Sequence, residues 1–272
     1  MPELPEVETT RRGIEPHVDG RRVVELAVHE PRLRWPVPRS VSHAVRGASI
    51  VGVRRRAKYL LIDLDRGSSL ILHLGMSGSL RVLPADTPRL KHDHFDLLLD
   101  SGRTLRFNDP RRFGSLHLAE GDAFEHPLLA SLGPEPLESA FDADYLWRVS
   151  RGRRVAVKPF LMNAQVVVGV GNIYASEALF RARVRPGRQT QHLKREEIVR
   201  IVESIKAVLA QAVKVGGTTL RDYVGADGSP GYFRQKLFVY ERAGEPCRKC
   251  SEAIRQRVQA QRSTYWCHTC QR

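Results

Sequence analysis

The cysteine spacing is the feature that most constrains this chain. All four cysteines lie in the last 26 residues, as Cys247-x2-Cys250, a gap of sixteen residues, and Cys267-x2-Cys270. Each CxxC turn directs two sulfurs at one point, and a hairpin between the pairs brings all four together, which is typical of a tetrathiolate zinc site. Two disulfides are the alternative, but thiols stay reduced inside a cell. We predict one structural Zn2+ per chain, with a closed tetrahedron and no open position for catalysis.

The ends and composition of the chain favour a cytoplasmic protein. The N-terminus, Met1-Pro2-Glu3-Leu4-Pro5-Glu6, is acidic and lacks an apolar run, so no signal peptide is expected. No stretch approaches the length of apolar residues that a membrane-spanning helix needs. Hydrophobic residues make up 42% of the chain, enough to bury a core, which excludes a largely disordered protein.

The charge predicts a polyanionic partner. Lys and Arg total 44 against 30 Asp and Glu, a formal net charge of +14. Excess cations on a folded domain repel one another, and phosphates relieve that repulsion, so nucleic acid is the favoured partner. The alternative is that the Arg-rich composition reflects genome bias alone. Charge does not separate a binding protein from an enzyme.

The first half of the chain has the pattern of an antiparallel β-sandwich or barrel. A helix is predicted over residues 5–18, because Pro5 suits a first turn and Glu6 and Glu8 favour the positive end of the dipole. Apolar runs separated by turn residues then predict strands over residues 22–30, 49–65, 69–74, 94–100, 104–108 and 115–118. Strands this close together favour antiparallel sheets over alternating β and α units.

Helical patterns follow a Gly- and Pro-containing linker at residues 132–136. Helices are predicted over residues 142–149, 159–164, 173–181 and 194–213, the last of them amphipathic. Asn172 is expected to cap the helix that begins at Ile173, where free N–H groups would suit a phosphate. The predicted division is a sandwich domain, a linker with the first helix, a helical domain and a zinc ribbon, over residues 1–131, 132–150, 151–236 and 237–272.

The first residues offer a nucleophile. Initiator Met is commonly removed before proline, which would leave Pro2 as a terminal secondary amine. An α-amino group is protonated less than lysine at neutral pH, so it can attack an electrophilic carbon and form an iminium ion. Glu3, next in the chain, can donate or shuttle a proton. On local sequence alone, a simple helix leader is the favoured interpretation.

Two further stretches carry basic or glycine-rich sequence. Strand alternation would place Arg54, Arg56 and Lys58 on one face, either as a phosphate-facing ridge or as a solvated face. Residues 216–219 and 225–233 surround a glycine-rich loop, which is either a lid over a pocket or a simple connection.

Two glycine-flanked turns carry an apolar tip. Phe113 follows Arg111 and Arg112, and an exposed aromatic beside arginine can wedge into stacked bases and replace an extruded one. Met76 lies between Gly75 and Ser77-Gly78. Packing in a core is the alternative for both Phe113 and Met76.

Together these stretches resemble the bacterial formamidopyrimidine-DNA glycosylases, a family of 8-oxoguanine repair enzymes. The resemblance covers essentially the whole chain and rests on motifs in the family's order, which are PELPEVET (2–9), RRAKYL (55–60), HLGMSGSL (73–80), KHDH (91–94), DPRRFG (109–114), VGVGNIYASE (168–177) and the zinc ribbon. Leu4 separates the chain from the sister endonuclease VIII group, whose members usually begin Pro-Glu-Gly-Pro-Glu.

The resemblance implies an α+β fold: an N-terminal antiparallel β-sandwich with an N-terminal helix, a helical domain with a helix–two-turn–helix element, and a zinc-ribbon hairpin. It implies a bifunctional DNA glycosylase and abasic-site lyase. Pro2 attacks C1′ of the damaged nucleotide, and Glu3 serves as acid in the sugar chemistry. Lys58 takes the place of the family's β-elimination lysine, and Arg262 that of the arginine linked to the second elimination.

The same resemblance implies DNA contacts. Three side chains match the residues that fill the gap after base flipping, namely Met76, Arg111 and Phe113. Three others fall at phosphate-contacting positions, namely His92, Arg154 and Asn172. Residues 222–233 correspond to the lesion-recognition loop. The expected partner is double-stranded DNA containing oxidised purines, and a monomeric, nucleoid-associated protein is expected.

Two other functions compete with this interpretation. One is a zinc-ribbon protein that binds damage but has lost catalysis, which the intact Pro2, Glu3 and Lys58 argue against. The other is an endonuclease VIII-like enzyme that prefers oxidised pyrimidines, which Leu4 and Phe113 argue against.

Overall fold

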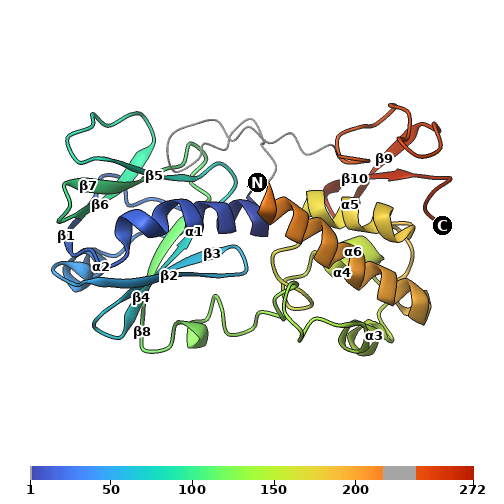
Figure 1. The fold of residues 1–272 in the computed structure, drawn as a ribbon, viewed down its shortest axis with the longest axis horizontal. Helices are drawn as coiled ribbons and strands as arrows, with labels where there is room; N and C mark the ends of the chain where they lie inside the picture. The colour runs from blue at the N-terminus through green and yellow to red at the C-terminus, as the bar shows by residue number, and fades with distance from the viewer. Residues whose placement is uncertain (1, 217–236) are drawn as a thin grey trace. The chain divides into compact units, whose positions relative to one another are not determined.

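The computed structural model describes residues 2–216 and 237–272. They form two compact units, residues 2–130 together with Gly216, and residues 131–215 together with 237–272 (Figure 1). The loop predicted at residues 222–233 lies outside the described residues, as does the predicted boundary at residue 236. Among the helices described, none is long and apolar enough to cross a membrane.

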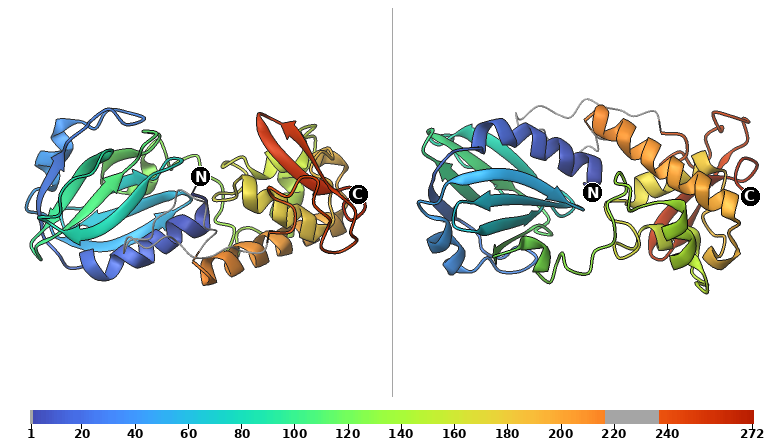
Figure 2. Two further views of the ribbon diagram at one scale, coloured as in Figure 1. Left: turned by 90° about the horizontal axis from the view of Figure 1, so that it is seen from above. Right: turned by 60° about the horizontal axis from the view of Figure 1, so that its bottom comes forward.

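The first unit is a sandwich of two four-stranded sheets, in which every pairing is antiparallel. One sheet has the order β1-β6-β7-β5 and the other β2-β3-β4-β8. Figure 2 shows this unit from two further sides. The strands are β1 (Val23–Val28), β2 (Ile50–Arg56), β3 (Tyr59–Leu64), β4 (Ser68–His73), β5 (Ser79–Pro84), β6 (Asp93–Leu99), β7 (Arg103–Asn108) and β8 (Ser115–Glu120). Its helices are α1 (Leu4–Val18), α2 (Arg39–Val45) and the short 3-10 turn η1 (Ala123–Glu125).

The core of this unit explains why α1 forms where it does. Val7, Ile14 and Val18 recur at helical spacing and are buried in one cluster with side chains of both sheets, among them Leu60 and Phe107. The helix therefore buries one face against the sandwich, and it contacts β2, β3 and β5. Its first residue follows Glu3 directly, so the core fixes the place of the N-terminus.

One strand prediction is wrong in a way that bears on the site. The run at residues 49–65 is two strands, β2 and β3, joined by a turn at Ala57 and Lys58. Ala57 has φ 56°, in the left-handed region. Such a turn position is usually occupied by Gly or Asn, which would have indicated the turn in the sequence. Lys58 therefore lies in the turn and not on a strand face with Arg54 and Arg56. The other predicted strands are confirmed with slightly shifted ends, and β5 and α2 were not predicted.

The second unit is helical and carries a β-hairpin. Its elements are α3 (Ala143–Ser150), α4 (Val157–Leu161), α5 (Asn172–Ala182), the short η2 (Thr190–His192), α6 (Arg195–Lys214), β9 (Ile254–Gln259) and β10 (Arg262–Cys267). Helix α5 contacts α4, α6 and β10, and α3 contacts α6. The predicted amphipathic helix is confirmed as α6, with Ile198, Ile201, Ile205 and Leu209 buried. The predicted α+β class, with its N-terminal sandwich and C-terminal hairpin, is confirmed.

Candidate functional site

The start of α1 holds two carboxylates close to the predicted nucleophile. Glu3 is the N-cap residue, and its backbone N–H donates to Glu6 Oε2 at 2.9 Å. Both side chains are 1% exposed, and Pro2 is buried as well. The positive end of the helix dipole favours their charge. From the sequence, Glu6 was predicted only to favour the positive end of the helix dipole. Its position three residues after Glu3 is the spacing of a capping box, which the structure contains.

Lys58 lies beside a neutral histidine. His73 ends β4 and pairs with Tyr59, the residue that follows Lys58. Burial, together with the positive charges of Lys58 and Arg34, lowers the pKa of His73 to about 4. The neutral ring accepts the N–H of Gly75 on Nδ1 at 3.0 Å. The turn that carries Lys58 therefore adjoins the start of the loop that carries Met76.

The two loops with the predicted gap-filling side chains are joined by a buried carboxylate. Asp109 is fully buried. It accepts from Ser77 Oγ at 2.7 Å and from the N–H of Gly114 at 2.8 Å. The N–H of Arg111 donates to the same carboxylate at 3.2 Å. Asp109 thus links the β4–β5 loop to the β7–β8 loop, and no sequence-based role was predicted for it.

Glycine at position 75 allows these loops to touch. Gly75 has φ +72°, and a Cβ atom there would lie 2.4 Å from the backbone nitrogen of Gly114. On the loops so joined, Met76 is only half-buried and Phe113 is 43% exposed, which contradicts core packing for Phe113. The Arg111 guanidinium carbon lies 5.0 Å from the centre of the Phe113 ring. The structure thus gathers the three predicted gap-filling residues on one pair of loops.

His92 precedes β6 in a left-handed conformation, with φ 74°. Its carbonyl accepts the N–H of Asp109 at 3.1 Å, which connects it to the same loop system. The buried carboxylate of Asp93 supports the segment before it, accepting from the N–H of Leu90 at 2.7 Å and from Asn108 Nδ2 at 2.8 Å. These bonds fix the backbone on both sides of the His92 side chain.

In the second unit, a buried lysine joins two of the predicted DNA-contacting elements. Lys158 in α4 is 1% exposed. Its Nζ donates to Asn172 Oδ1 at 2.6 Å, to the Ser263 carbonyl at 2.9 Å and to Thr264 Oγ1 at 2.9 Å. The prediction that Asn172 caps α5 is wrong, because Gly171 is the N-cap and the Asn172 side chain accepts from Lys158 instead.

Arg262 is the first residue of β10, directly before the residues that Lys158 holds. The turn that precedes it, Ala260-Gln261, has φ 45° and 60°, two consecutive left-handed residues that are not glycine. The Arg262 side chain is exposed and lines a cavity of about 200 Å³ together with Lys158. Arg154 is also exposed, between α3 and α4. Both guanidinium groups are therefore accessible to a phosphate.

Glu177 in α5 is a further charged residue, besides Asp109 and Lys158, for which no role was predicted from the sequence. Its carboxylate accepts from three consecutive backbone N–H groups, those of Phe238 at 2.8 Å and of Val239 and Tyr240 at 2.9 Å. The pKa of Glu177 is raised overall, because the effect of burial exceeds the opposing effect of these three donors. Its signal in the sequence, like that of Lys158, is a charged residue with small or apolar neighbours on both sides.

We expect replacement of Lys158 to destabilise the second unit. Lys158→Met removes three hydrogen bonds and leaves the Asn172 and Thr264 oxygens without this donor, so the free energy of unfolding should fall by about 2–4 kcal/mol. Denaturant unfolding measures this loss. The control is Lys206→Met, because Lys206 makes one exposed bond to the Glu138 carbonyl and should cost about 1 kcal/mol or less. Equal losses in the two variants would contradict the role given to Lys158.

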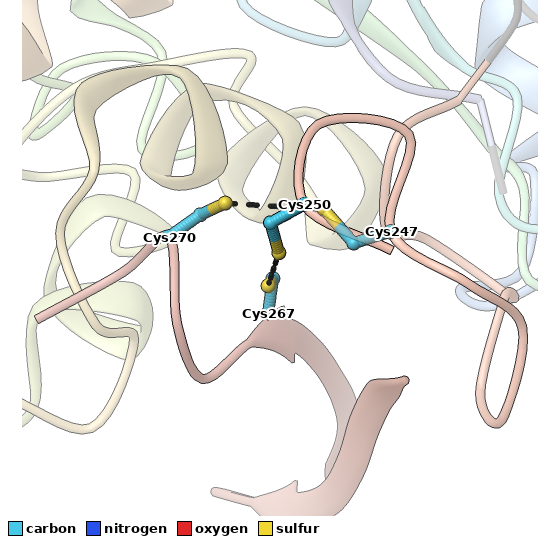
Figure 3. Close-up of side chains that lie close together, drawn as sticks. All are labelled: Cys247, Cys250, Cys267 and Cys270. Atoms are coloured by element: carbon cyan, nitrogen blue, oxygen red, sulfur yellow. Dashed lines mark hydrogen bonds between the residues drawn. The ribbon is translucent and has the colours of Figure 1, made fainter. Parts of the chain in front are cut away.

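The four cysteines meet in the ribbon (Figure 3). All four sulfurs lie within 4.8 Å of one another, with Cys247 and Cys270 at 3.9 Å and Cys250 and Cys267 at 3.4 Å. Disulfide sulfurs lie about 2.05 Å apart, so these pairs are not bonded. Zn–S bonds of about 2.3 Å place tetrahedral sulfurs about 3.8 Å apart, which the cluster fits. The prediction of one structural Zn2+ is confirmed by this geometry and by the zinc-finger match below.

Three models of known domains match the chain in order. The formamidopyrimidine-DNA glycosylase N-terminal domain matches residues 1–116, and the H2TH domain of the same glycosylase matches residues 132–224. The zinc finger found in FPG and IleRS matches residues 244–272. The matches agree with the sandwich, the helical region and the ribbon.

Full-length relatives agree with this assignment. A formamidopyrimidine-DNA glycosylase of Thioalkalivibrio sulfidiphilus is 62% identical over 272 residues, which is 100% of both chains. The crystal structure of the MutM (Fpg) protein from Thermus thermophilus is 42% identical, with a TM-score of 0.89 over 99% of this chain and 98% of that one. Wild-type Lactococcus lactis Fpg, in complex with an N7-benzyl-Fapy-dG-containing DNA, is 33% identical, with a TM-score of 0.92 over 100% of both chains. Matched over its whole length in both sequence and structure, the chain belongs to the formamidopyrimidine-DNA glycosylase family.

Proposed function

We propose that this protein is a base-excision-repair enzyme that removes oxidised purines from duplex DNA and cleaves the strand through a covalent intermediate on Pro2. The observation that carries the proposal is the full-length match to a relative that binds N7-benzyl-Fapy-dG-containing DNA. The N-terminus supports it, because Pro2 is followed by two buried carboxylates, Glu3 and Glu6. The activity is that of a DNA glycosylase and abasic-site lyase.

The proposed reaction uses the Pro2 nitrogen as nucleophile once Met1 is removed. The nitrogen bonds to C1′ while the bond from C1′ to the base breaks, and the base leaves with a proton. Glu3 acts as acid as the sugar ring opens, which gives an iminium ion between C1′ and the proline. The iminium acidifies the C2′ proton, so that removal of this proton expels the 3′ phosphate. A second elimination expels the 5′ phosphate and leaves a one-nucleotide gap.

Two cationic residues are proposed to assist the eliminations. In this proposal Lys58 serves the first and Arg262 the second, and both residues also contact phosphate. Support for Lys58 is its position in a tight turn with a fixed neighbour, His73. Support for Arg262 is its exposure at the end of a turn that the zinc hairpin holds.

DNA is proposed to lie on the exposed loops of the site. Three residues contact phosphates in this proposal, namely His92, Arg154 and Asn172. Three others fill the space of the extruded nucleotide, namely Met76, Arg111 and Phe113. The support is the exposure of Phe113, the Asp109 link between the two loops, and a net charge of +14.

The domain limits and the cellular place are part of the same proposal. The division is a catalytic sandwich domain, a linker with the first helix, a helix–two-turn–helix domain and a zinc ribbon, over residues 1–131, 132–150, 151–236 and 237–272. The protein acts as a monomer in the cytoplasm, associated with the nucleoid. Its charge of +14 supports residence on DNA.

Borohydride trapping on a duplex with one 8-oxoguanine opposite cytosine tests the function. Borohydride reduces an iminium between Pro2 and C1′ to a stable tertiary amine, so we expect a covalent protein–DNA adduct that migrates slowly on a denaturing gel. The matched duplex with guanine at that position should give none. Tight binding to the lesion duplex without an adduct would instead identify a damage-binding protein that lacks catalysis.

Replacement of Arg111 separates base flipping from general DNA binding. Arg111→Ala should weaken binding to undamaged duplex a few-fold, about 1 kcal/mol, since one exposed cation is lost. On the lesion duplex the loss should reach about 10- to 100-fold, because the vacated space is no longer filled. Arg112→Ala, the exposed neighbour, is the control and should show only the smaller effect. Equal losses for Arg111→Ala on both duplexes would count against the gap-filling role.

A further inference from the structure

The turn that carries Lys58 has a conformation that its own sequence does not favour. Ala57 has φ 56°, in the left-handed region where a Cβ atom is unfavourable, and the turn contains no glycine. The direction in which Lys58 leaves the turn depends on this conformation. Contacts from neighbouring residues must therefore hold it.

Arg55 supplies one such contact. Its Nη1 donates to the Ala57 carbonyl at 3.0 Å, and its Nε donates to Glu8 Oε2 at 3.2 Å. The Arg55 side chain is 13% exposed and that of Glu8 is 14% exposed. The guanidinium is thus fixed at two points, one on the turn and one on helix α1. Its planar fork can make both bonds at once, which the ammonium of lysine cannot do in the same geometry.

Glu8 is itself held by its own helix. Its Oε1 accepts from Arg11 Nε at 3.2 Å and from Arg12 Nε at 2.9 Å. Arg11 also donates to the Val53 carbonyl at 3.2 Å, which ties the helix to β2. Burial raises the pKa of Glu8, but the three arginines outweigh burial and lower it overall, so the carboxylate is ionised at neutral pH.

We propose that Glu8 and Arg55 are positioning residues for the elimination step, which set Lys58 in register with the N-terminal nucleophile. The link runs from α1, whose first turn adjoins Pro2 and Glu3, through the Glu8 carboxylate and the Arg55 guanidinium to the Ala57 carbonyl. One helix therefore positions both the amine and the turn of Lys58. The inference rests on the proposed function of Pro2 and Lys58.

The test compares two steps of the reaction in full-length, zinc-loaded protein. Arg55→Lys keeps the charge but loses the two-point contact. On duplex with a preformed abasic site, its single-turnover elimination rate should fall about tenfold, while the yield of borohydride-trapped adduct and the melting temperature stay close to wild type. Arg54→Lys is the matched control, because Arg54 lies on the same strand but binds Asp63. It should leave both readouts unchanged.

A double variant separates positioning from a general structural role. Lys58→Ala removes the group that Arg55 is proposed to position, so Arg55→Lys should cause no further loss of elimination rate in that background. Glu8→Ala, on the helix side of the link, should reproduce the effect of Arg55→Lys. A full tenfold loss in the Lys58→Ala background, or a normal elimination rate in Glu8→Ala, would overturn the inference while trapping on Pro2 stands. An adduct at normal yield from protein with a blocked N-terminus would instead overturn the proposed function.

Discussion

Protein with a blocked N-terminus is expected to form no borohydride-stable adduct with DNA that contains an abasic site. An acylated nitrogen cannot become an iminium, so retention of Met1 or of an N-terminal tag removes the proposed nucleophile. A terminal α-amine suits this role, because α-amino groups in model peptides are less basic than lysine side chains, with pKa values of about 7.7–8.0 against about 10.4, and so leave more free base at neutral pH. The secondary amine of proline is somewhat more basic than these α-amino groups, which reduces the difference. Adduct yield on a denaturing gel measures the effect, and the loss in the initial rate of adduct formation should exceed 100-fold, about 2.7 kcal/mol or more.

The control is the same tagged protein after a protease has exposed Pro2 as the first residue, which should restore trapping. DNA affinity should stay nearly unchanged in the blocked form, because the proposed phosphate contacts lie elsewhere. Pro2→Gly, which keeps a terminal amine, should retain some lyase activity while losing much base excision. If the blocked protein still formed the adduct at normal yield, the nucleophile would be a lysine, with Lys58 the first candidate.

The sequence predicted well where the physical signal is local. Each CxxC motif places two zinc ligands close together in the sequence, and the four sulfurs lie within 4.8 Å of one another in the structure. Apolar runs with turn residues between them predicted most strands of the sandwich, and 3/4 spacing predicted α6. The hairpin at Ala57 and Lys58 was missed because its left-handed residue is alanine, which carries no turn signal.

The supports of the site were not predictable in this way, since their partners lie far apart in the chain. Lys158 bonds to residues 105 and 106 positions away, and Glu177 to residues 61 to 63 positions away. No local pattern indicates such pairs. Resemblance supplied the roles of His92, Arg154 and Arg262, which stay predictions, whereas the structure shows the backbone bond of His92 to Asp109 and the pairing of Arg262 with Gln259.

Replacement of a zinc ligand is the second change with a large expected effect. Cys267→Ser should release the metal and unfold the ribbon, because metal binding provides folding free energy here, about 10–16 kcal/mol in small zinc-finger peptides. Cys267 is fully buried in a cluster with Phe180, Ile254 and Tyr265, so loss of the metal also opens this packing. Metal analysis should find much less than one zinc per chain.

DNA affinity should fall together with the metal, by about tenfold or more, because the hairpin that carries Arg262 loses its fixed geometry. His268→Ala is the matched control, since His268 is exposed, adjoins Cys267 in sequence and lies outside the thiolate cluster. It should keep one zinc and normal affinity. A Cys267→Ser protein with a full zinc content would show that three thiolates suffice. If wild-type protein were purified with far less than one zinc per chain, the ribbon would have to fold on packing alone. The small core of Phe180, Ile254 and Tyr265 makes folding without the metal unfavourable.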